Sequence, residues 1–449
     1  MKLPAQIQSI ITNNKNNGYT LSGYLVKGTL AGIVIQGLAV LLVFFTNFII
    51  ARLAGANVYG ITTYIFTCIT AVANIAVLGL DTVILREAAI YKNTQNGNCL
   101  KGLITLGVTA VFVISIPLSL LLFISLKSAS IVTQASVTGI LPLALTALPL
   151  LALTTLLQSV LQGLQKVIPA QLSEKIIKPA IFLLPVAALY FFSKTAVTVT
   201  NLIWFNVIAA GVGLLWVLVI TANAAKQFYK AKANYVVREW TKSASYFLVI
   251  AILQIINSRA DVFLLGAFKN GQQLGIYNIA ARLADFVGMP LFIINPVIAP
   301  AIARLYHAGD KQKLQKLITT SARAAGLLAL PAALLLIFAG RPVLSFFRPE
   351  FSQAYTAMLI VVVAQIINIA SGSVGYILTM TGHEKYALAS LLLSSIVNVG
   401  LNLLLIPKYG INGTAIAVAC GIVTWNAMML FFVVKKTDIH PTIFGAFKR

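Results

Sequence analysis

Two apolar stretches in the second half of the chain each contain an arginine and an aspartate. Arg259 and Asp261 lie in the run Asn-Ser-Arg-Ala-Asp, and Arg282 and Asp285 lie in Ala-Arg-Leu-Ala-Asp. A charge at the centre of a membrane helix costs roughly 2.5–3.5 kcal/mol, so a charge kept there is expected to have a role. Because a guanidinium binds phosphate oxygens through two parallel hydrogen bonds, the two arginines predict a binding site for an anionic substrate.

The spacing of the two arginines indicates that they lie at one depth. Arg259 comes seven residues before Gly266, and Arg282 comes seven residues after Gly275. At about 1.5 Å per helical residue, both are predicted roughly 10 Å below the same end of consecutive helices. Such a pair could form the wall of an internal cavity.

The nearby aspartates leave two interpretations open. In the first, the arginines bind the substrate, and Asp261 and Asp285 serve as gating ion-pair partners. In the second, Arg259 pairs with Asp285 and Arg282 with Asp261, and this lattice only locks the helices together. The two interpretations are compatible, because a cation held by a carboxylate can be released to a substrate phosphate.

Three charges in the first half lie nearer the ends of apolar stretches: Arg52, Asp81 and Arg86. Arg52 and Arg86 are further candidates for contact with the anionic substrate, and Asp81 is a candidate gating group. Arginines at helix ends also reach the membrane interface without any other function, and this simpler explanation stays open for both.

Motifs for catalysis and metal binding are missing from the sequence. There is no G-x-x-x-x-G-K-[ST] loop, no Gly-rich dinucleotide fingerprint, no H-E-x-x-H and no G-x-S-x-G. The three cysteines, Cys68, Cys99 and Cys420, are far apart and form no cluster with histidines. We therefore expect no catalytic residue, no metal site and no bound cofactor, and the chain is not expected to be an enzyme.

The composition is that of a membrane protein. Of 449 residues, 59% are hydrophobic and 10% charged, whereas a soluble protein carries about 25% charged residues. The net charge of +23 does not indicate nucleic acid, because the basic residues occupy short gaps between apolar stretches and not one soluble face. They are expected to set topology and to contact anionic membrane lipids.

The apolar stretches predict an all-α integral membrane protein with twelve transmembrane helices. A crossing needs about 20 apolar residues, and the fifth stretch is short and contains Pro179 and Pro185. The predicted spans are 29–51, 58–80, 102–126, 138–163, 176–192, 201–222, 244–266, 275–303, 319–339, 355–380, 386–406 and 412–434.

Basic residues concentrate in the tails and the even-numbered loops, which predicts that both termini lie in the cytoplasm. No cleavable signal peptide is expected, and residues 3–11 could lie on the membrane surface as a short helix. The odd-numbered loops hold only Arg52, Lys127, Lys194, Lys269, Arg341, Arg348 and Lys408.

The chain also repeats itself. Residues 59–105 and 273–319 share landmarks: Gly60 matches Gly275, Tyr91 matches Tyr306, and Leu-Ile-Thr closes both. Because six spans return the chain to its starting side, the halves are expected to form two six-helix lobes related by a pseudo-two-fold along the membrane normal. The predicted segments are an N-terminal cytoplasmic or interfacial segment 1–28, a first lobe 29–225, a linker 226–242, a second lobe 243–434 and a tail 435–449.

Several motifs resemble those of one transporter family. Arg52-Leu-Ala-Gly-Ala-Asn-Val-Tyr59-Gly60 is similar to the Arg-x-x-Gly-x-x-x-Tyr-Gly pattern of the polysaccharide flippases (Wzx-like) in the multidrug/oligosaccharidyl-lipid/polysaccharide (MOP) exporter superfamily. The stretch from Asp261 to Arg282 and the runs Ala303-Arg-Leu-Tyr306 and Ile406-Pro-Lys-Tyr-Gly-Ile-Asn-Gly413 resemble the same family.

The resemblance implies a MATE-like fold and an alternating-access carrier. Its substrate would be an oligosaccharide linked to undecaprenyl diphosphate, moved from the cytoplasmic to the outer leaflet of a bacterial inner membrane for O-antigen, capsule or exopolysaccharide assembly. Polysaccharide polymerase and glycosyltransferases would be partners. Coupling to H⁺, Na⁺ or the membrane potential would drive the transport.

Two other functions stay open. A cation-coupled drug antiporter of the same superfamily usually carries a carboxylate in its first helix, whereas residues 29–51 contain no Asp or Glu, and Asp81 or Asp261 would have to substitute. A non-transporting scaffold of a glycan-assembly complex would tolerate neutral residues at Arg259 and Arg282. Lipid II flippases also resemble this chain, but they have two further helices.

Overall fold

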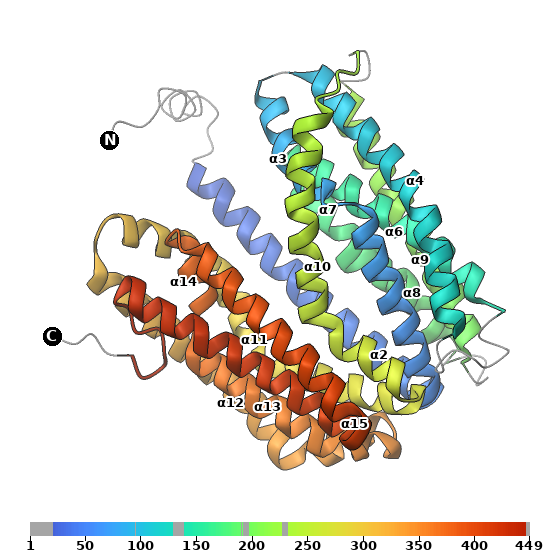
Figure 1. The fold of residues 1–449 in the computed structure, drawn as a ribbon, viewed down its shortest axis with the longest axis vertical. Helices are drawn as coiled ribbons and strands as arrows, with labels where there is room; N and C mark the ends of the chain where they lie inside the picture. Colours follow the sequence, from blue (N-terminus) through green and yellow to red (C-terminus); the bar gives the residue numbers. More distant parts are fainter. Residues whose placement is uncertain are drawn as a thin grey trace.

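The computed structural model describes residues 21–94, 96–128, 139–189, 191, 197–226 and 232–445. All regular secondary structure within these ranges is helical. The proposed surface helix over residues 3–11 lies outside the described residues. The helices run roughly side by side and form two groups that meet at one end (Figure 1).

Two of the long helices each make two crossings. α2 (Leu21–Ala76) is interrupted at Gly55, and α15 (Glu384–Thr437) is interrupted at Gly410. Both glycines have positive φ, 78° and 53°, a backbone region that residues with a Cβ rarely adopt. The chain can therefore reverse direction at each glycine while the helical hydrogen bonding nearly continues.

The remaining helices account for the other crossings, so the prediction of an all-helical, twelve-span fold is confirmed. Their bounds are α3 (Leu80–Asn93), α4 (Gly97–Ser128), α6 (Leu141–Gly163), α7 (Val167–Leu172), α8 (Lys178–Ala188), α9 (Val199–Ala225), α10 (Val237–Phe268), α11 (Gly271–His307), α12 (Lys311–Phe347), α13 (Tyr355–Ser371) and α14 (Val374–Met380). A short 3₁₀ turn, η5 (Pro349–Ala354), precedes α13.

The fifth crossing is longer than the sequence predicted. It begins at Val167 and not near residue 176, and α7 joins α8 through a π-helical turn, η2 (Ser173–Ile177). The N–H of Lys178 bonds to the carbonyl of Ser173, five residues back, immediately before Pro179, which has no N–H to donate. Lys175 consequently lies inside a helix and not in a loop.

Two expected segment boundaries also differ from the helices. α2 already begins at Leu21, within the segment expected to precede the first span, and α10 begins at Val237, within the expected linker. Polar and basic residues can also adopt a helix, so both helices begin before the apolar stretches that predicted the spans.

The first half of α10 leans on the first lobe. The indole N–H of Trp240 donates to the hydroxyl of Tyr91 at 3.1 Å, and Gly79 lies against the backbone of α10 at Ala244 and Leu248. A Cβ at Gly79 would not fit, so the glycine permits this close approach. α10 therefore connects the lobes along much of its length and not only at its ends.

The two lobes, residues 21–225 and 237–445, meet where α2 crosses α11. Gly60 on α2 and Gly275 on α11 touch backbone to backbone: a Cβ on Gly60 would overlap Gly271, and one on Gly275 would overlap Ala56. We call this end of the molecule, with the turns at Gly55, Gly410 and residues 268–271 and 347–349, the closed end. The two-lobe architecture is confirmed.

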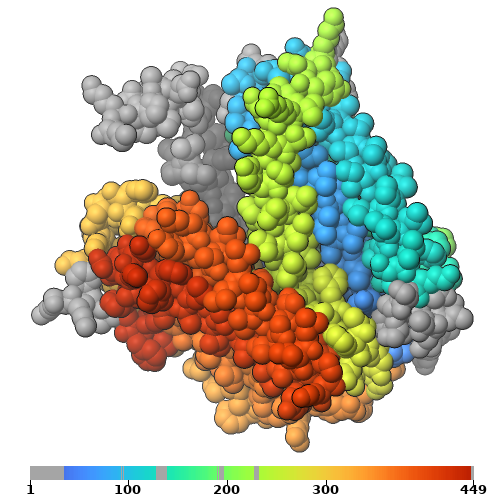
Figure 2. All heavy atoms as spheres, viewed as in Figure 1, coloured from blue at the N-terminus to red at the C-terminus, as the bar shows by residue number. Residues whose placement is uncertain are grey.

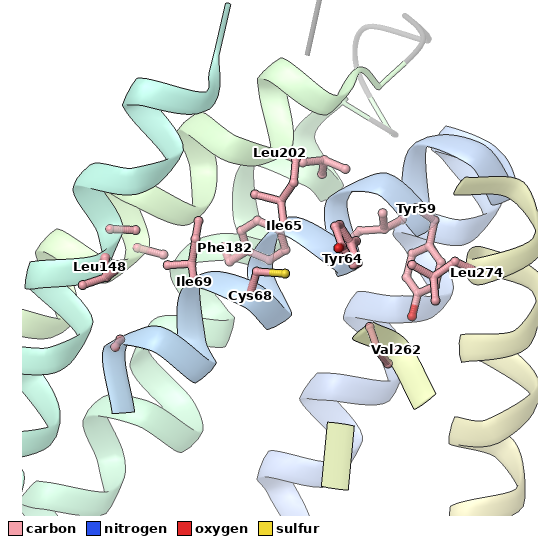
Figure 3. Close-up of a cluster of buried hydrophobic side chains, with 14 of the residues drawn as sticks. Tyr59, Tyr64, Ile65, Cys68, Ile69, Leu148, Phe182, Leu202, Val262 and Leu274 are labelled. Carbon is pink, nitrogen blue, oxygen red and sulfur yellow. The ribbon is translucent and has the colours of Figure 1, made fainter. Parts of the chain in front are cut away.

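At the opposite end, which we call the open end, the lobes diverge. Figure 2 shows the first half of α10 standing apart from α14 and the start of α15, with a hollow between them, whereas the second half of α10 packs against α15. The hydrophobic core is continuous within the first lobe, where Ile65, Cys68 and Ile69 face Phe182 and Leu202, and it reaches the crossing at Tyr59 and Leu274 (Figure 3).

Candidate anion-binding site

The four charges singled out in the second half lie on two neighbouring helices. Arg259 and Asp261 are on α10, and Arg282 and Asp285 are on α11. The helix bounds place Arg259 about 14 Å and Arg282 about 17 Å from the closed end of their helices, deeper than the expected 10 Å. Each guanidinium interacts electrostatically with the other charges of the group, so the structure brings the four residues together.

The ion-pair lattice that the sequence allowed is not formed. Within the described part of the chain, no carboxylate oxygen lies within 4.0 Å of either the Arg259 or the Arg282 guanidinium. Both side chains are partly accessible, and Asp285 is exposed. The two arginines therefore keep their N–H donors available for another anion.

The carboxylates have neutral partners instead. Asp261 accepts hydrogen bonds from the backbone N–H of Val262 at 2.8 Å and from the hydroxyl of Tyr277 at 3.1 Å. Asp285 accepts one from the side-chain amide of Gln365 on α13 at 3.2 Å. Asp261 thus links α10 and α11 through its hydrogen bond with Tyr277. Asp285 is exposed, and Gln365 donates the hydrogen bond that holds it.

A chain of amides continues from Asp285 into the second lobe. The side-chain oxygen of Gln365 accepts a hydrogen bond from Asn368 at 3.2 Å, and that of Asn368 accepts one from Asn426 on α15 at 3.1 Å. These bonds connect α11, α13 and α15, as helix–helix hydrogen bonds in membrane proteins do. Asn426 was not among the residues that the sequence singled out.

Tyr59 joins the two lobes beside the arginines. Its hydroxyl lies 2.8 Å from the side-chain oxygen of Asn47 on α2 and 3.0 Å from that of Asn278 on α11. Tyr59 and Asn278 are buried, and the Tyr59 hydroxyl is within electrostatic reach of both Arg282 and Arg259. The arginines therefore lie directly on the open-end side of the lobe crossing.

Sequence reasoning did not assign Tyr59 and Asn278 to the site. Tyr59 is part of the Arg-x-x-Gly-x-x-x-Tyr-Gly pattern, and Asn278 is a polar residue in an apolar stretch, four residues before Arg282. One helical turn separates Asn278 from Arg282, so the sequence contained a signal for a shared face.

The remaining three predicted residues lie elsewhere. Arg52 is at the closed end, where it bonds the carbonyl of Phe346 at 2.9 Å. Arg86 is exposed near the open end, where it forms a salt bridge of 2.9 Å with Glu87 and bonds Ser243. Asp81 is in the first turn of α3, and none of its interactions involves Arg259 or Arg282. The structure does not group these three with the arginine pair.

The fold is that of the two-lobe MOP transporters. The chain superposes on an inward-facing multidrug-resistance MATE family transporter with a TM-score of 0.69 at 12% identity, covering 90% of this chain and 94% of that one. It superposes on the lipid II flippase MurJ in an inward closed conformation with a TM-score of 0.70 at 14% identity, covering 89% of this chain and 86% of that one.

The chain belongs to the polysaccharide biosynthesis protein family of this superfamily, whose family model matches residues 25–306. A MatE model matches residues 247–404. Among curated proteins it is similar to a probable low-salt glycan biosynthesis flippase of Haloferax volcanii (25% identity over 39% of this chain and 38% of that protein). It is also similar to the uncharacterized membrane protein EpsK of Bacillus subtilis (27% identity over 50% and 43%). The matched regions span less than half the length of these relatives.

Proposed function

We propose that the protein is a flippase that moves a lipid-linked oligosaccharide across the membrane by alternating access. One observation carries the proposal: Arg259 and Arg282 lie together next to the lobe crossing, partly accessible and without a carboxylate within 4.0 Å in the described structure. The family and the similarity to probable glycan flippases support it.

The substrate class follows from the chemistry of the pair. Two guanidiniums on adjacent helices offer several N–H donors in planar forks, which suit the oxygens of a diphosphate better than a single carboxylate. Asn47, which is partly accessible and accepts a hydrogen bond from Tyr59 beside the arginines, suits a neighbouring sugar hydroxyl. We infer a diphosphate-linked glycan, of which undecaprenyl-diphosphate oligosaccharide is the form that the resemblance implies. O-antigen, capsule or exopolysaccharide units are the corresponding cargoes.

The charge of the loops supports an orientation. Helix ends and connections at the open end hold most of the basic residues, including Lys92, Lys166, Lys311 and Lys313, whereas the closed end holds few. By the positive-inside tendency, we infer that the open end and both termini face the cytoplasm, and a bacterial inner membrane is the location that the resemblance implies. A membrane potential that is negative inside favours outward movement of an anionic substrate, and Asp285 offers a site for coupling to H⁺ or Na⁺.

Arg259→Ala and Arg282→Ala, each with normal protein abundance, test this function. We expect lipid-linked glycan to accumulate on the cytoplasmic face of cells that carry either variant, and equally in cells from which the gene is deleted. Arg304→Ala is the matched control, because Arg304 is an exposed arginine of the same α11 near the open end. If Arg259→Ala and Arg282→Ala are merely unstable and exchanging charges with Asp285 or Asp261 restores them, the ion-pair interpretation replaces this proposal.

The MatE match over residues 247–404 favours one second candidate, a cation-coupled drug antiporter. The matching region contains Arg259, Arg282 and Asp285, so the same site would then bind a coupling ion or drug. A non-transporting scaffold in a complex with polymerase and glycosyltransferases predicts instead that glycan export survives the neutralisation of both arginines.

A further inference from the structure

A second pair of arginines lies at the closed end, one from each lobe. Arg52 is near the end of the first half of α2, and Arg348 follows α12. They line a cleft of about 500 Å³ together with Ser345, Phe346 and neighbouring prolines. The cleft is separate from the site at Arg259 and Arg282, which lies beyond the lobe crossing.

Each arginine is fixed by the opposite lobe. Arg52 donates one hydrogen bond to the carbonyl of Phe346 at 2.9 Å, and Arg348 donates two to the carbonyls of Arg52 and Leu53 at 3.0 and 3.3 Å. These bonds use only some of the five N–H donors of each guanidinium. Both side chains are exposed, and neither takes part in a salt bridge in the described residues.

Aromatic rings hold the Arg52 guanidinium in place. Its central carbon lies 5.9 Å from the ring centre of Phe48 and 5.3 Å from that of Phe346, and these two rings are stacked 5.2 Å apart. Contact with aromatic rings attracts the positive charge without using N–H donors. The Arg52 guanidinium is thus packed against aromatic rings at the lining of the cleft.

The cleft adjoins the surface that faces lipid. Phe338 and Leu335 of α12, two to three turns before it, are strongly exposed, as expected of side chains in contact with acyl chains. Ser345 adds a hydroxyl at the rim. Exposed arginines at the border between apolar and polar surface suit a phosphate at the level of lipid headgroups.

We propose that the cleft between Arg52 and Arg348 binds the phosphate of a phosphate ester. A phosphate bound there bridges the two lobes, because one arginine comes from each, and it therefore stabilises the closed end. The phosphate belongs either to an anionic lipid headgroup or to a free phosphate compound, since both present the same oxygens.

Binding to the full-length protein in detergent tests the proposal, with phosphatidylglycerol and inorganic phosphate as the probes. We expect native mass spectrometry to show phosphatidylglycerol bound at least about tenfold more weakly by Arg52→Gln than by the wild type, because the variant loses charge-assisted hydrogen bonds to the phosphate. Arg341→Gln is the control: Arg341 is exposed in the same part of α12 but lies over Tyr355 and does not line the cleft.

The two sources of phosphate give different results. If saturating inorganic phosphate displaces phosphatidylglycerol from the wild type, the cleft recognises phosphate alone; if it does not, the cleft recognises a lipid headgroup. The proposal is overturned if the wild type, Arg52→Gln and Arg341→Gln all bind phosphatidylglycerol with the same affinity and all bind inorganic phosphate with the same affinity.

A second variant and a second measurement cover the case in which Arg52→Gln does not fold. Arg52→Lys keeps a charge for the Phe346 carbonyl but loses the planar fork, and it should bind phosphatidylglycerol at least about threefold more weakly. Bound ligand should also raise the melting temperature of the wild type by more than that of Arg52→Lys at the same ligand concentration. These readouts do not involve transport, so their failure leaves the proposed function untouched.

Discussion

Gly60 and Gly275, which occupy matching positions in the two repeats, contact each other where α2 crosses α11. Ala56 and Gly271, one turn earlier on each helix, complete the crossing, so each helix presents two small residues four positions apart. Small residues at this spacing let membrane helices approach closely. Symmetry-related positions come this close only near the axis, so the pseudo-two-fold axis passes between the two glycines.

A methyl group at this crossing should separate the lobes. In Gly275→Ala the new Cβ would overlap the carbonyl of Ala56, which is backbone and cannot rotate away. We expect a loss of about 1–3 kcal/mol in the free energy of unfolding, as for other overpacked sites. Thermal unfolding of the purified variant measures it.

Gly400→Ala is the matched control, because a Cβ on Gly400 in α15 would meet nothing within 4 Å. It should leave stability unchanged or raise it by up to about 1 kcal/mol, since alanine favours a helix more than glycine does. Equal melting temperatures for the two variants would contradict a steric role of the crossing.

The turn at Gly55 is held by Glu350, and Glu350→Ala should loosen the closed end. The Glu350 carboxylate accepts a hydrogen bond of 2.6 Å from the N–H of Ala56, the first residue of the second half of α2. A lost helix cap costs about 1–2 kcal/mol, which shifts an equilibrium about 5–30-fold. We expect this shift to favour conformations in which the two lobes separate at the closed end.

Spin labels at Pro142 and Thr356 would measure that shift by pulsed electron paramagnetic resonance. Both residues are exposed at closed-end helix starts, Pro142 in the first lobe and Thr356 in the second. Longer distances should become more populated in Glu350→Ala but not in Gln353→Ala, an exposed neighbour in η5. Unchanged distance distributions in Glu350→Ala would show that Glu350 does not hold the two lobes together at the closed end.

Arg282→Lys should transport poorly even though it keeps the positive charge. An ammonium lacks the planar fork, and the loss of charged hydrogen bonds worth about 1.5–3 kcal/mol predicts a rate reduced about 10–100-fold. Translocation of a diphosphate-linked glycan in reconstituted vesicles measures the rate. Arg304→Lys on the same helix should retain the wild-type rate, and full activity of Arg282→Lys would exclude bidentate binding.

The C-terminal segment after α15 is docked against α12 through Gln315. The side-chain amide of Gln315 donates to the carbonyl of His440 at 2.7 Å, and its oxygen accepts from the N–H of His440 at 2.9 Å. Gln315→Ala would leave the partly buried N–H and carbonyl of His440 without this partner and should lower the free energy of unfolding by about 1–3 kcal/mol. Thermal melting checks this, with Lys316→Ala, a change at an exposed neighbour, expected to have no effect.

The same segment carries an acid-sensitive contact. The ammonium of Lys311 donates to the Asp438 carboxylate at 2.9 Å and lowers the pKa of Asp438 below its ordinary value. A depressed pKa stabilises the docked segment above the unfolded pKa of about 4, and the contribution is lost as pH falls through the lowered pKa. The protection factors of residues 438–445 against hydrogen exchange should therefore stay constant from pH 8 to about 5 and fall only in stronger acid, and Asp438→Asn should abolish that fall.

Overexpression separates the flippase from the drug antiporter. If the protein transports a lipid-linked glycan, cells that overproduce it should be no more tolerant of cationic dyes than cells that overproduce Arg282→Ala. Tolerance that rises with the wild type and disappears in Arg282→Ala would favour the antiporter.

Hydrophobic length and loop charge were sufficient to predict most of the fold from the sequence. A bilayer needs about 20 apolar residues per crossing, so the twelve spans could be counted along the chain. The match of Gly60 to Gly275 predicted the two lobes. The fifth span begins earlier than its apolar stretch predicts, because a π-helical turn carries Lys175, a residue type typical of loops, inside the helix.

The amino-acid sequence by itself determined which charges remain in the apolar stretches and that Arg259 and Arg282 lie at similar depth on consecutive helices. Only the tertiary structure decided their partners, because the direction of a side chain depends on how helices far apart in sequence cross. Asp261 turns to Tyr277 and Asp285 to Gln365, which leaves both arginines without a carboxylate oxygen within 4.0 Å in the described structure. The contact between Arg52 and Arg348 has the same cause. Nearly 300 residues separate the two arginines in the chain, and the crossing of α2 and α11 brings together the parts of the two lobes that carry them.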